Sequence, residues 1–243
     1  MQLLRDAFPD DPPRDMALSH ALLLEVARGE RPDLLRIYRP GATVAFSKLD
    51  ARAAGFPAAA AAARAHGFAP LVRLGGGHAA AYGPGALVYE ELAAHDAVFE
   101  GTQERYAAAT ARIQRALARV GVDAAAGELE GEYCAGSHSL NVGGRIKIAG
   151  LSQRVVRGAA LVTTMLLLDD DPPLRPVLTD VYAALGIPWS PSTAGAIGDL
   201  GPAPTHAALT DALVAEHGGG LPPTALSPQT LAAADALAPR HVA

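Results

Sequence analysis

The residues best suited to chemistry lie in one stretch, Gly131–Gly158, which contains Cys134, the single cysteine of the chain. The same stretch holds Lys147, which is flanked by isoleucines on both sides. An amine in apolar surroundings is easily desolvated, and desolvation lowers its pKa. Because the thiolate and not the thiol is the nucleophile, a cation such as Lys147 close to Cys134 would favour the reactive form. The stretch therefore predicts a nucleophilic site with a cationic rim.

Each of these residues also has an ordinary structural explanation. A single cysteine is often a small buried hydrophobe, although the glycines around Cys134 are more typical of a loop. Lys147 could protect a strand edge against aggregation. Arg154 and Arg157 could be solvated surface charges. His138 follows Cys134 by four residues and is either a candidate general base or a surface histidine.

A second candidate element is a run of three glycines. Pro70–Leu74 is a short apolar segment that predicts a strand, and it leads directly into Gly75, Gly76 and Gly77. Consecutive glycines permit positive φ and allow backbone N–H groups to approach a ligand, although they also suit a mobile loop or a bulge. Neither the dinucleotide fingerprint nor the P-loop pattern is matched here, so the run does not predict a nucleotide site.

The sequence resembles a known family at these residues. The central stretch is similar to the signature of the biotin/lipoate protein ligase superfamily at Glu132–Gly136, Gly144–Gly150 and Ser152–Arg154. It is closest to the cysteine-containing octanoyl (lipoyl) transferase branch. A second segment, Arg73–Ala80, resembles the family's Arg-x-x-Gly-Gly-Gly loop. The two motifs occur in the family's order, and the resemblance covers approximately residues 34–168.

The resemblance implies transfer of an octanoyl or lipoyl group, through a cysteine thioester, to a lysine of a lipoyl-carrier protein. That carrier would be the glycine cleavage H protein or the lipoyl domain of a 2-oxoacid dehydrogenase, with acyl carrier protein as a further candidate donor. No cofactor and no metal are implied. Lys147 would hold Cys134 as thiolate or bind the acyl carbonyl, a role for which the glycine N–H groups compete. The implied catalytic residues are Cys134 and Lys147, and the implied substrate-binding residues are Arg73, Gly75, Gly76, Gly77, His78 and Gly150.

Two alternatives remain open. An ATP-dependent lipoate ligase would form an acyl-adenylate with ATP and Mg²⁺ and would need no cysteine. Against it, Ala81–Leu87 stands where such ligases commonly have a His/Asp-Gly-Asn-type run, and few residues after Leu168 remain for an accessory domain. A non-catalytic relative that only binds acyl chains or lipoylated proteins would keep the pocket and tolerate the loss of Cys134.

Composition limits the class of protein. An apolar fraction of 50% and a charged fraction of 19% in 243 residues describe a globular chain. One cysteine excludes an intramolecular disulfide framework, and no N-terminal segment resembles a signal peptide. No apolar run approaches the roughly 20 residues of a membrane span. A net charge of −5 gives no support to nucleic-acid binding. We therefore expect a soluble, reduced, cytoplasmic protein without a membrane or nucleic-acid partner.

The elements that must position these residues follow from periodicity and turn signals. We expect an irregular lead-in over Met1–Arg14 and then a helix over Asp15–Glu30 that is capped by Asp15. Leu34–Arg39 and Thr43–Phe46 predict two strands of one sheet. Three carboxylates precede a Pro-Pro pair at Asp169–Asp171, where a solvated turn competes with a metal site. Further predicted helices are Pro57–Gly67, Thr102–Val120, Pro176–Leu185, Thr205–His217 and Ser227–Leu237, and further predicted strands are Ala86–Leu92 and Ala159–Leu168.

The predicted fold class is α+β, with mixed, mostly antiparallel sheets flanked by helices and a small helical C-terminal portion. The resemblance implies the catalytic domain of the biotin/lipoate protein ligase type. We expect that domain over residues 1–175 and a helical extension packed on it over residues 176–243. This extension has too many Pro and Gly interruptions to form an independent core.

Overall fold

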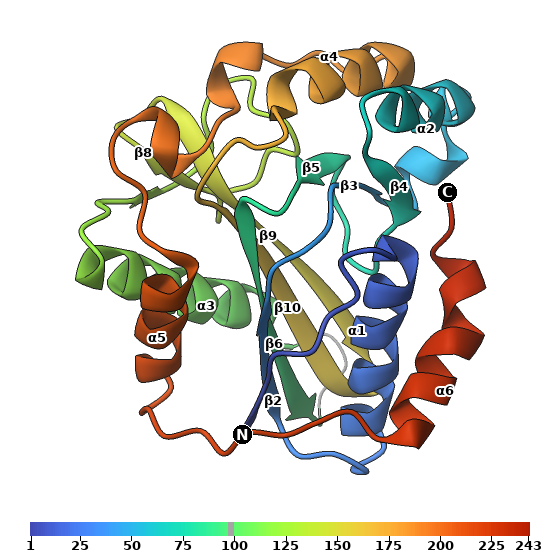
Figure 1. The fold of residues 1–243 in the computed structure, drawn as a ribbon, viewed down its shortest axis with the longest axis vertical. Coiled ribbons are helices and arrows are strands. Elements are labelled where there is room, and N and C mark those ends of the chain that lie inside the picture. Colours follow the sequence, from blue (N-terminus) through green and yellow to red (C-terminus); the bar gives the residue numbers. More distant parts are fainter. Residues whose placement is uncertain (97–99) are drawn as a thin grey trace.

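A seven-stranded sheet runs through the centre of the computed structural model, which describes residues 1–96 and 100–243 (Figure 1). Within it, β1 is parallel to β2 and the remaining pairings are antiparallel. In a second, three-stranded sheet, β3 is parallel to β4 and antiparallel to β5. The prediction of mixed, mostly antiparallel sheets is confirmed. The large sheet has the order β1 (Gln2–Leu4), β2 (Leu34–Tyr38), β6 (Ala86–His95), β10 (Gly158–Leu167), β9 (Ile146–Val156), β8 (Leu140–Val142) and β7 (Ala125–Ala126), and the small sheet has the order β4 (Ala69–Val72), β3 (Thr43–Phe46) and β5 (Ala80–Tyr82).

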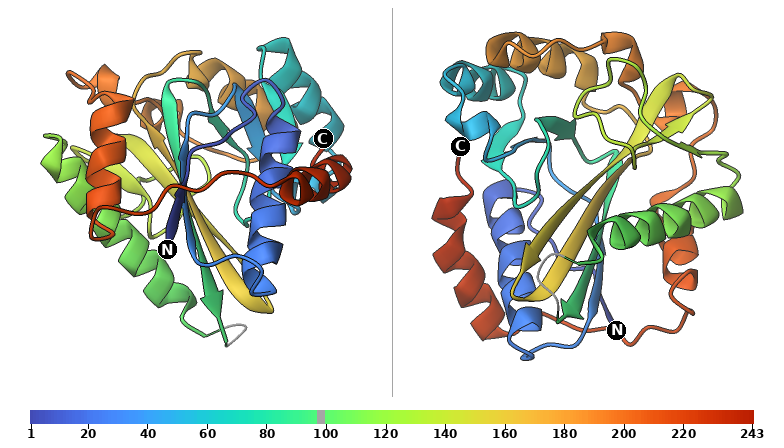
Figure 2. Two further views of the ribbon diagram at one scale, coloured as in Figure 1. Left: turned by 60° about the horizontal axis from the view of Figure 1, so that its bottom comes forward. Right: turned by 180° about the vertical axis from the view of Figure 1, so that it is seen from behind.

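Helices cover both faces of the large sheet (Figures 1 and 2). On one face, α1 (Pro12–Ala27) packs against α6 (Pro228–Leu237). On the other face, α3 (Thr102–Arg119) packs against α5 (His206–Ala215). The pair α2 (Phe56–Ala65) and α4 (Leu174–Leu185) lies beside the small sheet. Short 3₁₀ segments complete the chain: η1 (Asp50–Arg52), η2 (Pro191–Thr193), η3 (Ile197–Asp199) and η4 (Ala238–Arg240).

The strand β2 shows why the central strands lack a polar face. All five of its residues are buried. Leu34 and Tyr38 join the core on the α1 side, whereas Leu35 and Ile37 join the core on the α3 side. A strand that is covered on both faces is apolar at every position, except where a polar side chain has a buried partner to bind. The exception here is Arg36, which faces the α1 side with Leu34 and Tyr38.

The predicted lead-in and first helix need correction. Gln2–Leu4 forms β1, and α1 begins at Pro12 and ends at Ala27. The cap is Asp11, whose side chain accepts from the N–H of Arg14, and proline is well suited to the first helical turn. Asp15 lies inside the helix and is buried, and its carboxylate accepts from Arg36 at 2.5 Å. Periodicity could not reveal this charge partner 21 residues away.

The expectation that Leu34–Arg39 and Thr43–Phe46 share a sheet is wrong. β2 belongs to the large sheet and β3 to the small one. Between them the chain turns at Gly41, where a Cβ would lie 1.9 Å from the carbonyl oxygen of Pro9. The helix α2 then returns the chain so that β4 can pair with β3 in parallel. Close packing at the turn separates two strands that are adjacent in sequence.

The other predicted elements are confirmed within a few residues. The longest helix, α3, buries the predicted stripe at Ala109, Ile113 and Leu117. The strands β6 and β10 cover the predicted apolar runs, and β6 continues to His95. The helices α2, α4, α5 and α6 occupy the remaining predicted ranges. No helix in the described part of the chain is long and apolar enough to cross a membrane.

The C-terminal residues lie against the rest of the fold in several places. α6 packs on α1, Leu3 bridges to Pro223, and Leu71 bridges to Val242. The helix α4 begins at Leu174, so it spans the position where we divide the chain. The division into residues 1–175 and 176–243 stays a prediction.

Candidate functional site

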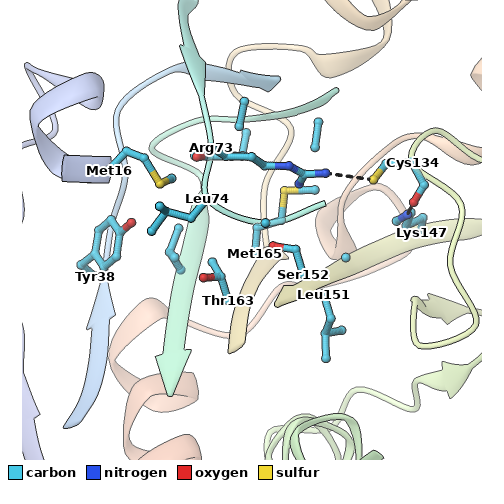
Figure 3. A pocket seen from close by; sticks show the side chains of 16 residues that line it. Met16, Tyr38, Arg73, Leu74, Cys134, Lys147, Leu151, Ser152, Thr163 and Met165 are labelled. Atoms are coloured by element: carbon cyan, nitrogen blue, oxygen red, sulfur yellow. Dashed lines mark hydrogen bonds between the residues drawn. The ribbon is translucent and has the colours of Figure 1, made fainter. Parts of the chain in front are cut away.

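A pocket lies between the two sheets, with Cys134 and Lys147 at one end and Met16 and Tyr38 at the other (Figure 3). The empty space between its walls, with the open solvent at its mouth included, is about 620 Å³. Strands of both sheets and α1 contribute to its lining. Much of its wall is apolar and comes from Met16, Ala45, Leu74, Val88, Leu151 and Met165. Such a wall suits a hydrocarbon chain.

Cys134 lies in the loop before β8 and has a strained backbone. Its φ is +44°, the only positive φ of a non-glycine residue in the described part of the chain. Two hydrogen bonds hold this conformation in place. The N–H of Cys134 donates to the hydroxyl of Tyr182 at 2.7 Å, and that hydroxyl donates to the carbonyl of Ala79 at 2.9 Å. Strain of this kind persists only where neighbouring structure fixes it, and it is common at functional sites.

The thiol of Cys134 is held by two donors from the glycine loop. Arg73 Nη2 and the backbone N–H of His78 each lie 3.3 Å from Sγ. Burial raises the pKa of this thiol, but the charge of Arg73, then that of Lys147, and the two hydrogen bonds together lower it below its usual value. These contacts therefore stabilise the thiolate form of Cys134 relative to that of an ordinary cysteine. The cation that contacts the sulfur is Arg73, whereas the sequence offers Lys147 as the candidate for a nearby cation.

Lys147 is fully buried, and its ammonium group points at the loop that carries Cys134. Nζ donates to Oε1 of Glu132 at 2.9 Å, to the carbonyl of Tyr133 at 2.9 Å and to the carbonyl of Cys134 at 2.8 Å. An ammonium group has three protons, so all of its donors are in use. Glu132 also accepts from the hydroxyl of Ser139 at 2.6 Å. Lys147 thus fixes the backbone beneath the thiol and acts on the sulfur through its charge.

The three glycines of the loop meet different surroundings. At Gly77, φ is +93°, and a Cβ would lie 2.7 Å from Sγ of Cys134 and 2.8 Å from Nη2 of Arg73. At Gly75 a Cβ would lie 2.4 Å from the hydroxyl oxygen of Ser152. At Gly76 a Cβ would meet no atom within 4 Å. The contact with the thiol therefore requires glycine at 77, and the packing on β9 requires it at 75.

The remaining predicted site residues divide into two groups. Gly150 lines the pocket, where its Cα faces the Lys147 side chain. His78 contributes its backbone N–H, because its ring bonds to the carboxylate of Asp50 at 2.9 Å. His138 bonds to Gln103 at 3.1 Å and stacks on Tyr106, and none of its described contacts involves Cys134. The ring of neither histidine contacts the thiol.

Sequence reasoning missed two residues that support the site, Glu132 and Tyr182. Glu132 belongs to the quoted motif, and a lysine predicted to lie among apolar residues needs a buried anion as a partner. That requirement could have singled out Glu132. Tyr182 lies 48 residues from the cysteine whose N–H it accepts, and no local pattern connects the two.

The acidic segment at Asp169–Asp171 shows no metal-binding arrangement. In the described residues, no group of three or more His, Cys, Asp or Glu side chains could hold a metal ion. Asp170 instead accepts from the N–H of Leu174, the first residue of α4.

Comparison with known families decides the relationship. Residues 11–218 match the family described as the lipoyl protein ligase A/B catalytic domain. The chain belongs to this family. The resemblance seen in the two sequence motifs is confirmed, and so is the fold class that it implied.

Among individual members of the family, the chain is 31% identical over 180 residues to a protein of Geobacillus kaustophilus. The aligned region covers 72% of this chain and 62% of the relative. It is 28% identical over 204 residues to a protein of Bacillus velezensis, with 84% of this chain and 70% of the relative covered. Both relatives are named octanoyl-[GcvH]:protein N-octanoyltransferase. The chain thus spans less than two thirds of the first relative's length.

A crystal structure of lipoate-protein ligase A bound with ATP has the same fold. Its TM-score with this chain is 0.78 at 18% identity, with 98% of this chain and 94% of the other covered. This likeness supports the architecture only.

Proposed function

We propose that this lipoyl protein ligase A/B family member is an acyltransferase. It moves an octanoyl group, through a thioester on Cys134, to the lysine of a lipoyl-carrier protein. The observation that carries the proposal is the contact of Arg73 and the His78 N–H with the sulfur, which favours the thiolate form at one end of an apolar pocket. A ligase that forms an adenylate has no use for such a sulfur. The names of the two relatives support octanoyl transfer and point to GcvH as one of the partner proteins.

In the first step, the thiolate of Cys134 attacks the acyl carbonyl of the donor. The donor's sulfur or nitrogen leaves and takes up a proton, and the acyl group remains on Sγ. In the second step, the neutral ε-amine of the acceptor lysine attacks the thioester, the amine loses a proton, and the thiolate is restored. Only acyl bonds are exchanged, so the reaction needs no ATP and no other cofactor.

Donors for the oxyanion are present beside the sulfur. Arg73 Nε is buried and has no hydrogen-bond partner in the described part of the chain. The N–H groups of Gly76 and Gly77 also take no part in the hydrogen bonds between described residues. We assign the developing oxyanion to these groups, because all three protons of Lys147 are already in use. In this assignment Arg73, Cys134 and the glycine loop act on the substrate, and Lys147 is a positioning residue.

Intact-mass measurement tests the proposal. The protein is incubated with the uncharged thioester S-octanoyl-N-acetylcysteamine or with octanoate, ATP and Mg²⁺. We expect the wild type to gain one hydroxylamine-labile octanoyl group from the thioester only, and Cys134→Ala to gain none. Adenylate formation from octanoate and ATP would favour the ligase alternative. An alanine variant that transfers octanoyl at the wild-type rate would remove Cys134 from the mechanism.

A further inference from the structure

An open groove adjoins the mouth of the acyl pocket. It runs from the segment after β3, across the glycine loop, to the middle of β9. Leu74 and Gly75 line both the groove and the acyl pocket, so the two are continuous. Gly77 also lines the groove, and a Cβ at this position would lie 2.7 Å from the sulfur of Cys134. A chain segment lying in this groove would therefore lie next to the pocket that contains Cys134.

The groove is positively charged, although the whole chain has a net charge of −5. Its lining includes Lys48 and Arg154 and no carboxylate. Neither cation has an ion-pair partner in the described part of the chain. Burial and nearby cations, Arg154 and Lys48 among them, together lower the pKa of His20 to about 4. The two charges therefore act on the same region of the molecule.

One apolar side chain accompanies these cations. Leu49 is 65% exposed and is one of three large hydrophobic residues that stand out at the surface of the described chain. It follows Lys48 directly and lines the same groove. A single exposed leucine is ordinary on a protein surface, and at this place it adds apolar contact area to the groove beside Lys48.

The positive charge of the acceptor lysine indicates what kind of segment can bind in this groove. An acceptor lysine is itself a cation, and Lys48, Arg154 and Arg73 would repel it. A lysine-bearing segment can enter only if it brings its own carboxylates to meet these charges. Once it is bound, the same cations disfavour the protonated amine and so lower its pKa, which raises the fraction of the nucleophilic form. Recruitment through flanking carboxylates and activation of the amine then come from one set of charges.

We propose that this groove is the docking site for an acidic segment that flanks the acceptor lysine of the carrier protein. The proposal rests on the proposed function, because it requires that an acyl group on Cys134 be passed to a lysine. It assigns Lys48 and Arg154 to recognition of the acceptor and leaves formation of the thioester to the residues around Cys134.

Peptide binding tests the groove without any chemistry. The probe is a fluorescein-labelled peptide with a single lysine between glutamates, and the matched control peptide has glutamines in their place. We expect the wild type to bind the acidic peptide on the order of tenfold more tightly at low salt, and this preference to fall as salt is added. Lys48→Glu/Arg154→Glu should abolish or reverse the preference. The control variant Arg157→Glu changes an exposed arginine outside the groove lining and should keep it.

Acyl transfer from octanoylated enzyme to the same peptides gives the second measurement. We expect Lys48→Glu/Arg154→Glu to accept octanoyl from S-octanoyl-N-acetylcysteamine at the wild-type rate and to lose on the order of tenfold in transfer to the acidic peptide. Wild-type binding and transfer in this double variant would overturn the docking proposal. Selective binding of the acidic peptide without any acylation of Cys134 would instead leave the groove assignment standing and overturn the proposed function.

Discussion

Replacing Lys147 with methionine should separate a positioning lysine from one that contacts substrate. Methionine fills similar space and removes the charge, which leaves the carboxylate of Glu132 buried without its cation. Breaking a buried ion pair by removing one partner costs about 3–5 kcal/mol. Ser139 and the N–H of Leu129 still donate to Glu132 and keep the loss within this range. The free energy of unfolding should therefore fall by about 3–5 kcal/mol, a large part of the stability of an ordinary domain.

Two measurements check this expectation. Urea unfolding followed by circular dichroism gives the change in stability, with Lys48→Met as the control for loss of an exposed lysine. The double variant Lys147→Met/Glu132→Gln should recover part of the loss, because it removes the uncompensated charge. The pH dependence of alkylation by iodoacetamide reports the pKa of the Cys134 thiol. Lys147 helps to lower that pKa, so its midpoint should move to higher pH in Lys147→Met.

A different outcome would refute the reasoning. If Lys147→Met unfolds within about 1 kcal/mol of the wild type and keeps its alkylation midpoint, the ion pair does not hold the loop. Loss of acyl transfer in such a protein would then mean that Lys147 acts on the acyl carbonyl, which is one of the two roles that the family resemblance implied for it.

Two further predictions concern the glycine loop. Burial raises the pKa of the Cys134 thiol, and Arg73 is the strongest of the influences that lower it. Arg73→Met should therefore raise this pKa, so that alkylation of Cys134 slows at neutral pH and recovers only as the pH rises. An unchanged alkylation rate would show that Arg73 does not stabilise the thiolate. Gly77→Ala should abolish acylation of Cys134, because the added methyl group would displace the sulfur, whereas Gly76→Ala should be tolerated. Equal acylation of the two variants, measured by intact mass, would contradict the clash expected at Gly77.

The sequence predicts the local elements of this fold well, because they depend on short-range patterns. The stripe on Thr102–Arg119 and the apolar run of β10 follow from periodicity alone. The assignment of β2 and β3 to one sheet fails, because strand pairing is not local and Gly41 turns the chain away. The prediction of Asp15 as the helix cap is wrong for a similar reason. Its side chain is held by Arg36, which lies on another element and cannot be found from local sequence.

The candidate site shows the same division. Residue types in the two motifs single out Cys134, Lys147 and Arg73, and all three line one pocket. Their contacts depend on the tertiary fold, which brings Arg73 across 61 residues to the sulfur and turns Lys147 toward the backbone. His138, for which the sequence left both a general base and a surface histidine open, stacks on Tyr106 of α3, so closeness in sequence to Cys134 does not by itself give contact.

The hydroxyl of Tyr182 ties the helix α4 to two loops at once. It accepts from Cys134 and donates to Ala79, so the nucleophile loop and the end of the glycine loop share one anchor point. A fragment that ended at residue 175 would lose this anchor, and both loops would be released together. The smallest portion of this chain that could be grafted into another protein with its thiol geometry intact must therefore extend through Tyr182 and include the whole of α4.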